Sequence, residues 1–417
     1  MKPVSIKRTS CRLCNSPKMS LEVQLPLTFI ADKYASIPKQ TSSYFPLDLY
    51  QCQNCGHVQV LDILPLEILF SSDYSYKPSR SQSLIQHFSD YASQFASELN
   101  HIPKKVLDIG SNDGLFLECL RDQYNCQILG IDPAEAPVLY ARGRNIPTEH
   151  AFFNSESVEP LLSKYGLFDV ISANNVFAHN DDLAGFASSV ASALTENGIF
   201  CFEISYLVDI VEKTLIGTIF HEHLSHHSLI PLDLFLRKFG LNLFHVVPVS
   251  SQGGALQCFA TKDLGRPASQ QLKDLVAREE QLAVTSSAYM SKFRLNIAQL
   301  LADFQFKLNA AVNSSTRVIA YGAARSANLL IEQLQLSNRL FCILDGNPEK
   351  VGKFLFNSST PILNATNFTF MPGDLVIPLA WIHSEAIYSR LQSDPSLQLT
   401  DVGWLQFHPT IEFKKFL

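Results

Sequence analysis

The sequence contains no segment that would carry the chain into a membrane. No apolar run approaches membrane-spanning length, and Val246–Val249 is interrupted by Pro248. Residues 1–20 are polar and contain two cysteines, so they lack the apolar core of a signal peptide. We therefore expect a cytoplasmic protein without a membrane partner.

The chain also has fewer basic than acidic residues. The chain has 33 Lys and Arg against 39 Asp and Glu, a formal net charge of -6 and a pI of about 6.1. No basic surplus is available to neutralise a phosphate backbone, so a nucleic-acid partner is not expected. The hydrophobic share of 46% is too high for a disordered chain, and 417 residues are too many for one core, so two or three domains are expected.

Nine cysteines are present, and an odd number argues against a disulfide framework. Four of them form two Cys-x-x-Cys pairs, Cys11 with Cys14 and Cys52 with Cys55, and Gly56 permits a tight turn after the second pair. Four thiolates satisfy tetrahedral Zn²⁺ and leave no open position, so we predict a structural zinc site. The alternative is two unrelated turns with free thiols. A redox role is disfavoured because neither pair starts a helix after a strand.

Strand and helix patterns alternate along most of the chain, which predicts an α/β fold with parallel sheets. Expected strands are at 105–109, 127–131, 168–173, 198–204, 317–321, 340–344 and 374–380. Expected helical segments are at 81–99, 115–121, 270–312 and 323–335. The expected architecture is an N-terminal zinc-binding module at 1–70, a central Rossmann-like domain at 71–255 and a smaller Rossmann-like α/β domain at 256–417.

A glycine turn follows the first central strand and opens a helix. Its spacing, Asp-x-Gly-x-x-x-Gly from Asp108 through Gly110 to Gly114, differs from the Gly-x-Gly-x-x-Gly of a dinucleotide site. The next strand ends in Asp132, whose carboxylate can accept hydrogen bonds from both hydroxyls of a ribose. These features predict an S-adenosylmethionine site; a turn without a ligand and an NAD site are the alternatives. The residues predicted to contact this cofactor are Asp108, Gly110, Asn112, Gly114, Asp132, Pro133, Phe153, Asn174 and Asn175.

Residues 218–227 contain four of the twelve histidines. This segment could be a metal site, an exposed polar loop or a source of acid–base catalysis, because a neutral imidazole is the natural proton acceptor near pH 7. His179 follows the strand at 168–173, and strand ends line the ligand crevice of such sheets, so it is a further candidate.

With these motifs in order, the chain resembles the zinc-containing, S-adenosylmethionine-dependent C-3 methyltransferases of nucleotide-linked deoxysugars, those of the tetronitrose, mycarose and noviose type. The resemblance covers nearly the whole chain. Besides the cysteine pairs, it is carried by the segments Asp73-Tyr74-Ser75-Tyr76, Ile109–Gly114, Ala173–His179, Glu222-His223, Gln252–Leu256, Tyr321–Ala324 and Asp345–Pro348.

The resemblance implies methyl transfer to C3 of a nucleotide-linked 4-keto sugar through an enolate, with the C-terminal domain binding the nucleotide sugar. It implies that His223 is the base, oriented or tuned by Glu222, and that His179 and a tyrosine stabilise the enolate oxygen. The catalytic candidates are Tyr74, Tyr76, His179, His221, Glu222 and His223. His221 is included because the family's second tyrosine falls on Phe220, which has no hydroxyl.

A second departure lies in the C-terminal turn, where the family's Lys-Gly falls on Ser326-Ala327 and Arg325 could replace the lysine in holding phosphates. O- or N-methylation of a small molecule, which needs no enolate, is the alternative activity. A non-catalytic homologue that binds the same ligands is the alternative from another class, and Phe220 is the residue that favours it. No feature of the sequence indicates an oligomeric state.

Overall fold

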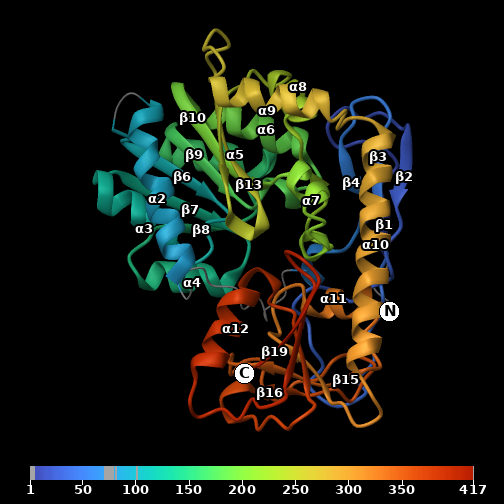
Figure 1. Cartoon of the computed structure of the whole chain (residues 1–417). Helices are drawn as coiled ribbons and strands as arrows, with labels where there is room; N and C mark the ends of the chain where they lie inside the picture. Colours follow the sequence, from blue (N-terminus) through green and yellow to red (C-terminus); the bar gives the residue numbers. More distant parts are fainter. Residues whose placement is uncertain (1–4, 70–78, 80–81, 100–101, 417) are drawn as a thin grey trace.

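A computed structural model of the chain describes residues 5–69, 79, 82–99 and 102–416 (Figure 1). The described strands form sheets of four, seven and six strands and one two-stranded pair, β1 with β5. The α/β fold with an N-terminal module and two sheet-containing domains is therefore confirmed. Tyr74 and Tyr76 lie outside the described residues.

The N-terminal module is a small antiparallel sheet with the strand order β11-β4-β3-β2, although β11 comes from far along the chain. A short helix follows it. The bounds of these elements are β1 Ile6–Lys7, β2 Met19–Val23, β3 Leu49–Cys52, β4 Val58–Val60, β5 Asp62–Ile63, α1 Leu66–Leu69 and β11 Ser225–His226.

The central domain contains the seven-stranded sheet, with the order β12-β13-β10-β9-β6-β7-β8. Strands β6 to β10 run parallel, and β13 pairs antiparallel with β10 and β12. The strands are β6 Lys105–Ile109, β7 Gln127–Asp132, β8 Thr148–His150, β9 Phe168–Asn174, β10 Leu194–Ser205, β12 Asn242–Val249 and β13 Ala255–Thr261. The domain expected to end at residue 255 therefore has a sheet that runs on to Thr261.

Helices cover both faces of this sheet, because successive residues of a strand point to opposite sides. Val106 packs in one apolar cluster with residues of α2 and α3, whereas Leu107 packs in another with residues of α5, α6 and α8. The helices and 3-10 turns are α2 Gln82–Leu99, α3 Leu115–Tyr124, α4 Glu135–Gly143, α5 Ser155–Tyr165, η2 Phe177–His179, α6 Leu183–Ala193, α7 Leu207–Glu212, η3 Ile216–Thr218, α8 Leu229–Arg237 and η4 Ser251–Gly253.

The C-terminal domain has a six-stranded sheet with the order β16-β15-β14-β17-β18-β19, parallel except for β19. Its elements are β14 Val318–Tyr321, α11 Ala327–Gln333, β15 Leu340–Asp345, β16 Ile362–Asn364, η5 Ala365–Asn367, β17 Leu375–Pro378, η6 Trp381–His383, α12 Ser384–Ser393, β18 Gly403–Gln406 and β19 Glu412–Lys415. The helix expected from residue 323 begins only at Ala327, because the intervening turn is held by Asp345, which accepts a hydrogen bond from the backbone N–H of Ala323 at 2.6 Å.

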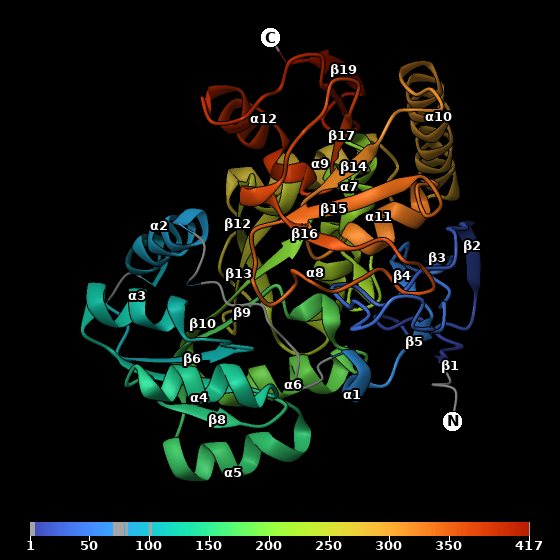
Figure 2. The same ribbon diagram turned by 90° about the horizontal axis from the view of Figure 1, so that it is seen from below.

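Two helices, α9 Gln270–Gln281 and α10 Ser287–Ala311, join the domains, as the periodicity at 270–312 predicts. Helix α10 runs beside the N-terminal module and on to the C-terminal domain (Figure 1), and it contacts β2, α7 and β18. The second view shows the C-terminal sheet beside the N-terminal module as well (Figure 2). No helix within the described ranges is long and apolar enough to cross a membrane.

Candidate functional site

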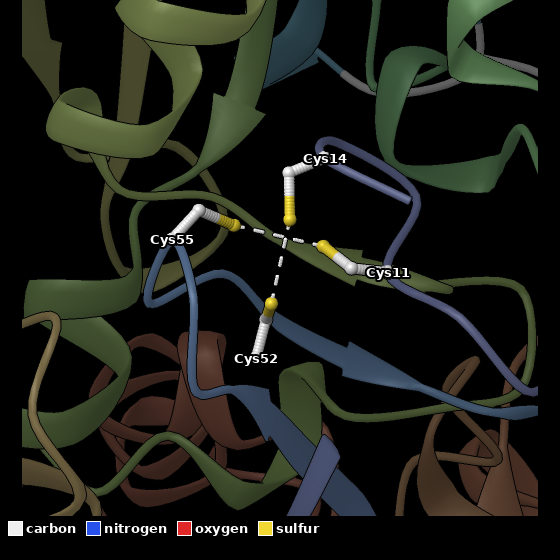
Figure 3. A group of neighbouring side chains, drawn as sticks. All are labelled: Cys11, Cys14, Cys52 and Cys55. Carbon is white, nitrogen blue, oxygen red and sulfur yellow. Dashed lines mark hydrogen bonds between the residues drawn. The ribbon is translucent and has the colours of Figure 1, made fainter. Parts of the chain in front are cut away.

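The two cysteine pairs come together as the spacing predicts. Figure 3 shows the four sulfur atoms pointing at one common position, and all four lie within 4.8 Å of one another. Gly56 has φ of 79°, and a Cβ there would lie 2.4 Å from the Cβ of Thr285, so only glycine fits the turn. Four clustered sulfur ligands are the donor set of a closed, structural zinc site.

The N-terminal module with its four cysteines, hereafter the zinc module, also anchors residues 218–227, the histidine segment. It does so through Arg12, which follows the first cysteine. The Arg12 side chain is fully buried, and its guanidinium donates to the carbonyl oxygens of Val60 at 2.6 Å and Leu224 at 3.1 Å. Strand β4 of the module pairs with β11, so Gln59 lies opposite Ser225. Because Leu224 directly follows Glu222-His223, the zinc module holds the candidate catalytic residues in place.

The glycine turn has the geometry of a cofactor cradle. Gly110 has φ of 67°, and a Cβ there would lie 2.3 Å from a methyl group of Val176, so the backbone approaches the end of β9 as closely as it can. Gly114 starts α3 in the left-handed conformation. Both side-chain polar atoms of Asn174 are buried and without a hydrogen-bond partner among the described residues, which is the state expected of a group that meets a ligand.

Two acidic residues flank this cradle. The Asp132 carboxylate accepts from the backbone N–H groups of Asn112 at 2.9 Å and Ala134 at 2.8 Å. A carboxylate offers about four acceptor positions, so it can fix the turn and still accept from ribose hydroxyls. Asp108 accepts from Ser172 Oγ at 2.6 Å, and burial raises the pKa of Asp108 to about 7.

A buried carboxylate that the sequence analysis missed lies at the end of β10. Glu203 is fully buried and accepts hydrogen bonds from His87 at 2.6 Å, Asn175 at 3.3 Å and Gln257 at 3.2 Å. It holds the side chain of Asn175, whose φ of 56° is left-handed, and ties α2 to the strand ends. The sequence does carry a signal for this residue, because Glu203 is the one charged residue in the apolar run Gly198–Ile204.

The remaining predicted cofactor contacts are less diagnostic. Phe153 is buried, and its ring packs edge-on against Phe186 at 5.5 Å, as a core residue does. The carbonyl of Pro133 lies 3.0 Å from Nε2 of His150.

Three rings gather where the segment after β9 meets the histidine segment. The His223 ring lies 3.8 Å from the Phe220 ring and 5.0 Å from the His179 ring, between centroids. Nδ1 of His223 lies 2.6 Å from the carbonyl oxygen of Thr218, which can only accept, so Nδ1 carries the proton and Nε2 carries the lone pair. Burial holds the pKa of His223 well below its usual value and lowers the pKa of His179 to about 3, so both rings are neutral near pH 7.

Within the part of the chain that the structure describes, Glu222 makes no hydrogen bond to His223, so the expected orienting contact is not observed. Its carboxylate instead pairs with the Arg325 guanidinium at 3.1 Å, and burial raises the pKa of Glu222 while Arg325 opposes that rise. Arg325 comes from the turn after β14, so the C-terminal domain contributes to the same site. The sequence predicts that Arg325 holds phosphates, whereas in the structure its guanidinium lies over the Phe220 ring, 5.6 Å from the ring centroid.

His221 faces a different neighbour. It is fully buried, its ring packs edge-on to Phe45 of the N-terminal module at 6.0 Å, and burial lowers its pKa to about 4. The structure therefore brings His179, Phe220, Glu222 and His223 together with Arg325.

Three family models match successive parts of the chain. A zinc-binding domain matches residues 11–70, a methyltransferase domain matches 82–246, and the C-methyltransferase C-terminal domain matches 250–395. The C-methyltransferase NovU of Streptomyces niveus is 27% identical over 350 residues, which cover 82% of this chain and 82% of NovU.

Similar solved structures include an S-adenosylmethionine-dependent methyltransferase of Clostridium acetobutylicum, which is 16% identical in sequence. The match covers 49% of this chain and 96% of that chain, with a TM-score of 0.35. Magnesium protoporphyrin IX methyltransferase of Synechocystis with bound SAH gives 16% identity, 42% and 82% coverage and a TM-score of 0.33. The family matches follow one another along the chain, so the chain has the domain arrangement of the zinc-containing C-methyltransferases, and its cofactors are S-adenosylmethionine and zinc.

Proposed function

We propose that this C-methyltransferase transfers a methyl group to C3 of a nucleotide-linked 4-keto-deoxysugar through an enolate. The observation that carries the proposal is a buried, neutral His223 whose Nδ1–H is fixed on the Thr218 carbonyl, beside a second neutral ring, His179. Methylation of oxygen or nitrogen does not require a base that removes a proton from carbon. A carbon atom beside a carbonyl, in contrast, becomes nucleophilic only when such a base removes its proton. A C-methyltransferase therefore has a use for this arrangement.

His223 is the proposed base because its unprotonated Nε2 is available at neutral pH. The hydrogen bond to Thr218 fixes the tautomer and the ring plane, so the lone pair has one direction. A low pKa makes His223 a weak base, but it keeps the imidazole unprotonated over a wide pH range. The proton taken from C3 would reside on Nε2.

The enolate oxygen needs donors that are in place before the charge develops, and each such donor contributes roughly 3–4 kcal/mol. His179 is one proposed donor, since its Nε2 is buried without a hydrogen-bond partner among the described residues. Tyr74 or Tyr76 is proposed as a second donor from the resemblance alone.

S-adenosylmethionine, when bound at the Gly110–Gly114 turn, supplies an electrophilic methyl group. We propose that Asp132 holds its ribose and that Asn174 meets it from the end of β9. The role of this part of the chain is alignment of the methyl group with the sugar carbon.

The C-terminal domain is proposed to bind the nucleotide. Its turn after β14 resembles the cofactor turn: the Asp345 carboxylate accepts from the backbone N–H groups of Ala323 at 2.6 Å and Asn347 at 2.7 Å, as Asp132 does in the central domain. Lys350, which follows β15, reaches this turn: it donates to the carbonyl oxygen of Ala323 at 2.7 Å and pairs with Asp32, so a cation is present near the proposed phosphate position.

Incubation of the zinc-loaded protein with methyl-labelled S-adenosylmethionine and TDP-, UDP- and GDP-linked 4-keto-6-deoxyhexoses tests the proposal. The expected product carries the label on C3, as located by NMR. A label on oxygen or nitrogen, or no transfer to any of these sugars, would refute it.

A further inference from the structure

The Arg325 guanidinium is a charged group of the site to which the proposed function gives no role. It reaches Glu222 and Phe220 from the C-terminal domain, whereas the other residues of the site belong to the central domain. The backbone carbonyl of Arg325 also accepts from the N–H of Asp32 at 2.9 Å, so the turn that carries it is fixed between the module and the C-terminal domain.

Phe220 has no hydroxyl where the sequence resemblance places a tyrosine. Its ring contacts His223, and the Arg325 guanidinium lies over the same ring, 5.6 Å from its centroid. A cationic N–H donor therefore packs against the ring that takes the place of the tyrosine.

The ion pair with Glu222 fixes the position of the Arg325 guanidinium. The Arg325 side chain is 24% exposed and the Glu222 side chain is 2% exposed, with 3.1 Å between nitrogen and oxygen. A planar guanidinium has five N–H donors, and a carboxylate on one edge orients the whole group. Burial is the main cause of the lowered pKa values of His179 and His223, and the positive charge of Arg325 lowers both pKa values further.

We propose that Arg325 replaces the missing tyrosine by donating a hydrogen bond to the enolate oxygen of the ketosugar. The inference rests on the proposed function. Nε2 of His223 takes the C3 proton, the C–H electron pair forms the C3–C4 double bond, and the carbonyl pair moves to the oxygen that Arg325 faces. That pair then returns as C3 forms its bond to the methyl carbon, and the carbon–sulfur bond breaks to leave S-adenosylhomocysteine.

Deuterium exchange at C3 of the same ketosugar panel, measured with no methyl donor present, tests this role. Arg325→Met removes the donor at similar volume and should slow exchange by roughly 100-fold, the loss expected for one oxyanion donor. Arg325→Lys keeps the charge and should retain part of the rate. Arg339→Met is the matched control, because Arg339 pairs with Asn309 on the surface and should leave the rate unchanged.

Restoring the hydroxyl separates this role from a structural one. Phe220→Tyr in the Arg325→Met background should recover part of the lost exchange, since a hydroxyl can donate but cannot repair a broken domain contact. The acid limb of the exchange rate should also move to higher pH in Arg325→Met, because removal of a positive charge raises the pKa of His223.

If Arg325→Met exchanges deuterium and transfers the methyl group at the wild-type rates, the proposed role of Arg325 is overturned and the proposed function stays intact. A slow Arg325→Met variant with neither recovery by Phe220→Tyr nor a shifted acid limb would do the same. Absence of exchange in the wild type with every ketosugar would instead overturn the proposed function, and the inference with it.

Discussion

Arg12 provides a direct way to measure how strongly the zinc module supports the catalytic segment. Its side chain is fully buried and donates to Val60 and Leu224, to the Gln59 side chain at 3.0 Å and to Asp181 at 3.0 Å. Arg12→Ala would remove the charged donor from three buried acceptors, although Leu224 keeps the N–H of Val60 at 3.0 Å and the Gln59 side chain keeps the backbone N–H of residue 12 at 3.2 Å. A hydrogen bond from a charged donor contributes about 1.5–3 kcal/mol, whereas the pairing with Asp181, which is 40% exposed, adds little.

We therefore expect Arg12→Ala to lower the free energy of unfolding by about 3–5 kcal/mol, because three buried hydrogen bonds from a charged donor are lost. Arg8→Ala is the matched control, because Arg8 pairs with the same Asp181 from a 23% exposed position and should cost less than about 1 kcal/mol. Urea unfolding of both zinc-loaded variants, with methyl transfer measured below the transition, gives the comparison. Transfer should fall in Arg12→Ala even while the protein remains folded, because Leu224 loses an anchor beside His223.

Equal destabilisation by the two substitutions would refute the reasoning. Full methyl transfer by a destabilised Arg12→Ala would refute the link between the module and the site, although not the zinc site itself.

Three further outcomes are expected. Elemental analysis should find one zinc per chain, and Cys52→Ser should lose it and unfold the N-terminal module, because metal binding supplies folding energy; a metal-free protein of normal stability would contradict the site. Calorimetry on Asp132→Ala should show a clear loss of S-adenosylmethionine affinity, since both the ribose acceptor and the anchor of the turn are removed, and unchanged affinity would move the site elsewhere. Stability should fall as the pH drops below about 6.5, because burial keeps the pKa values of six histidines below those of the unfolded chain, so the unfolded state binds more protons. Each of these histidines lowers the free energy of unfolding by roughly 1.4 kcal/mol per pH unit until the pH reaches its pKa in the folded protein. A free energy of unfolding that stays constant between about pH 6.5 and 5 would refute this prediction. These histidines are His57, His179, His221, His223, His226 and His227.

Local patterns were sufficient for most of the fold. Strand β6 was predicted with its observed bounds, and the zinc ligands followed from spacing alone, because both depend on residues that are neighbours in sequence. The late start of α11 could not be predicted, since Asp345 holds the preceding turn from another strand.

The site was less accessible to sequence reasoning. His221 and His223 lie two residues apart, and only the fold places one ring against Phe45 and the other against His179. Likewise, the Thr218 carbonyl that fixes His223 is a backbone atom and leaves no signal in the sequence. Arg325 is separated from Glu222 by about a hundred residues, and a domain contact brings them together.

The most direct test of the enolate mechanism is solvent exchange by His223→Asn. In deuterated buffer without a methyl donor, the wild type should wash deuterium into C3 of a ketosugar substrate, whereas His223→Asn should bind both ligands yet neither exchange nor methylate. His221→Asn should retain exchange, because its ring packs against Phe45. Exchange that persists in His223→Asn and disappears in His221→Asn would transfer the base role to His221, and methylation unaffected by either substitution would contradict the mechanism.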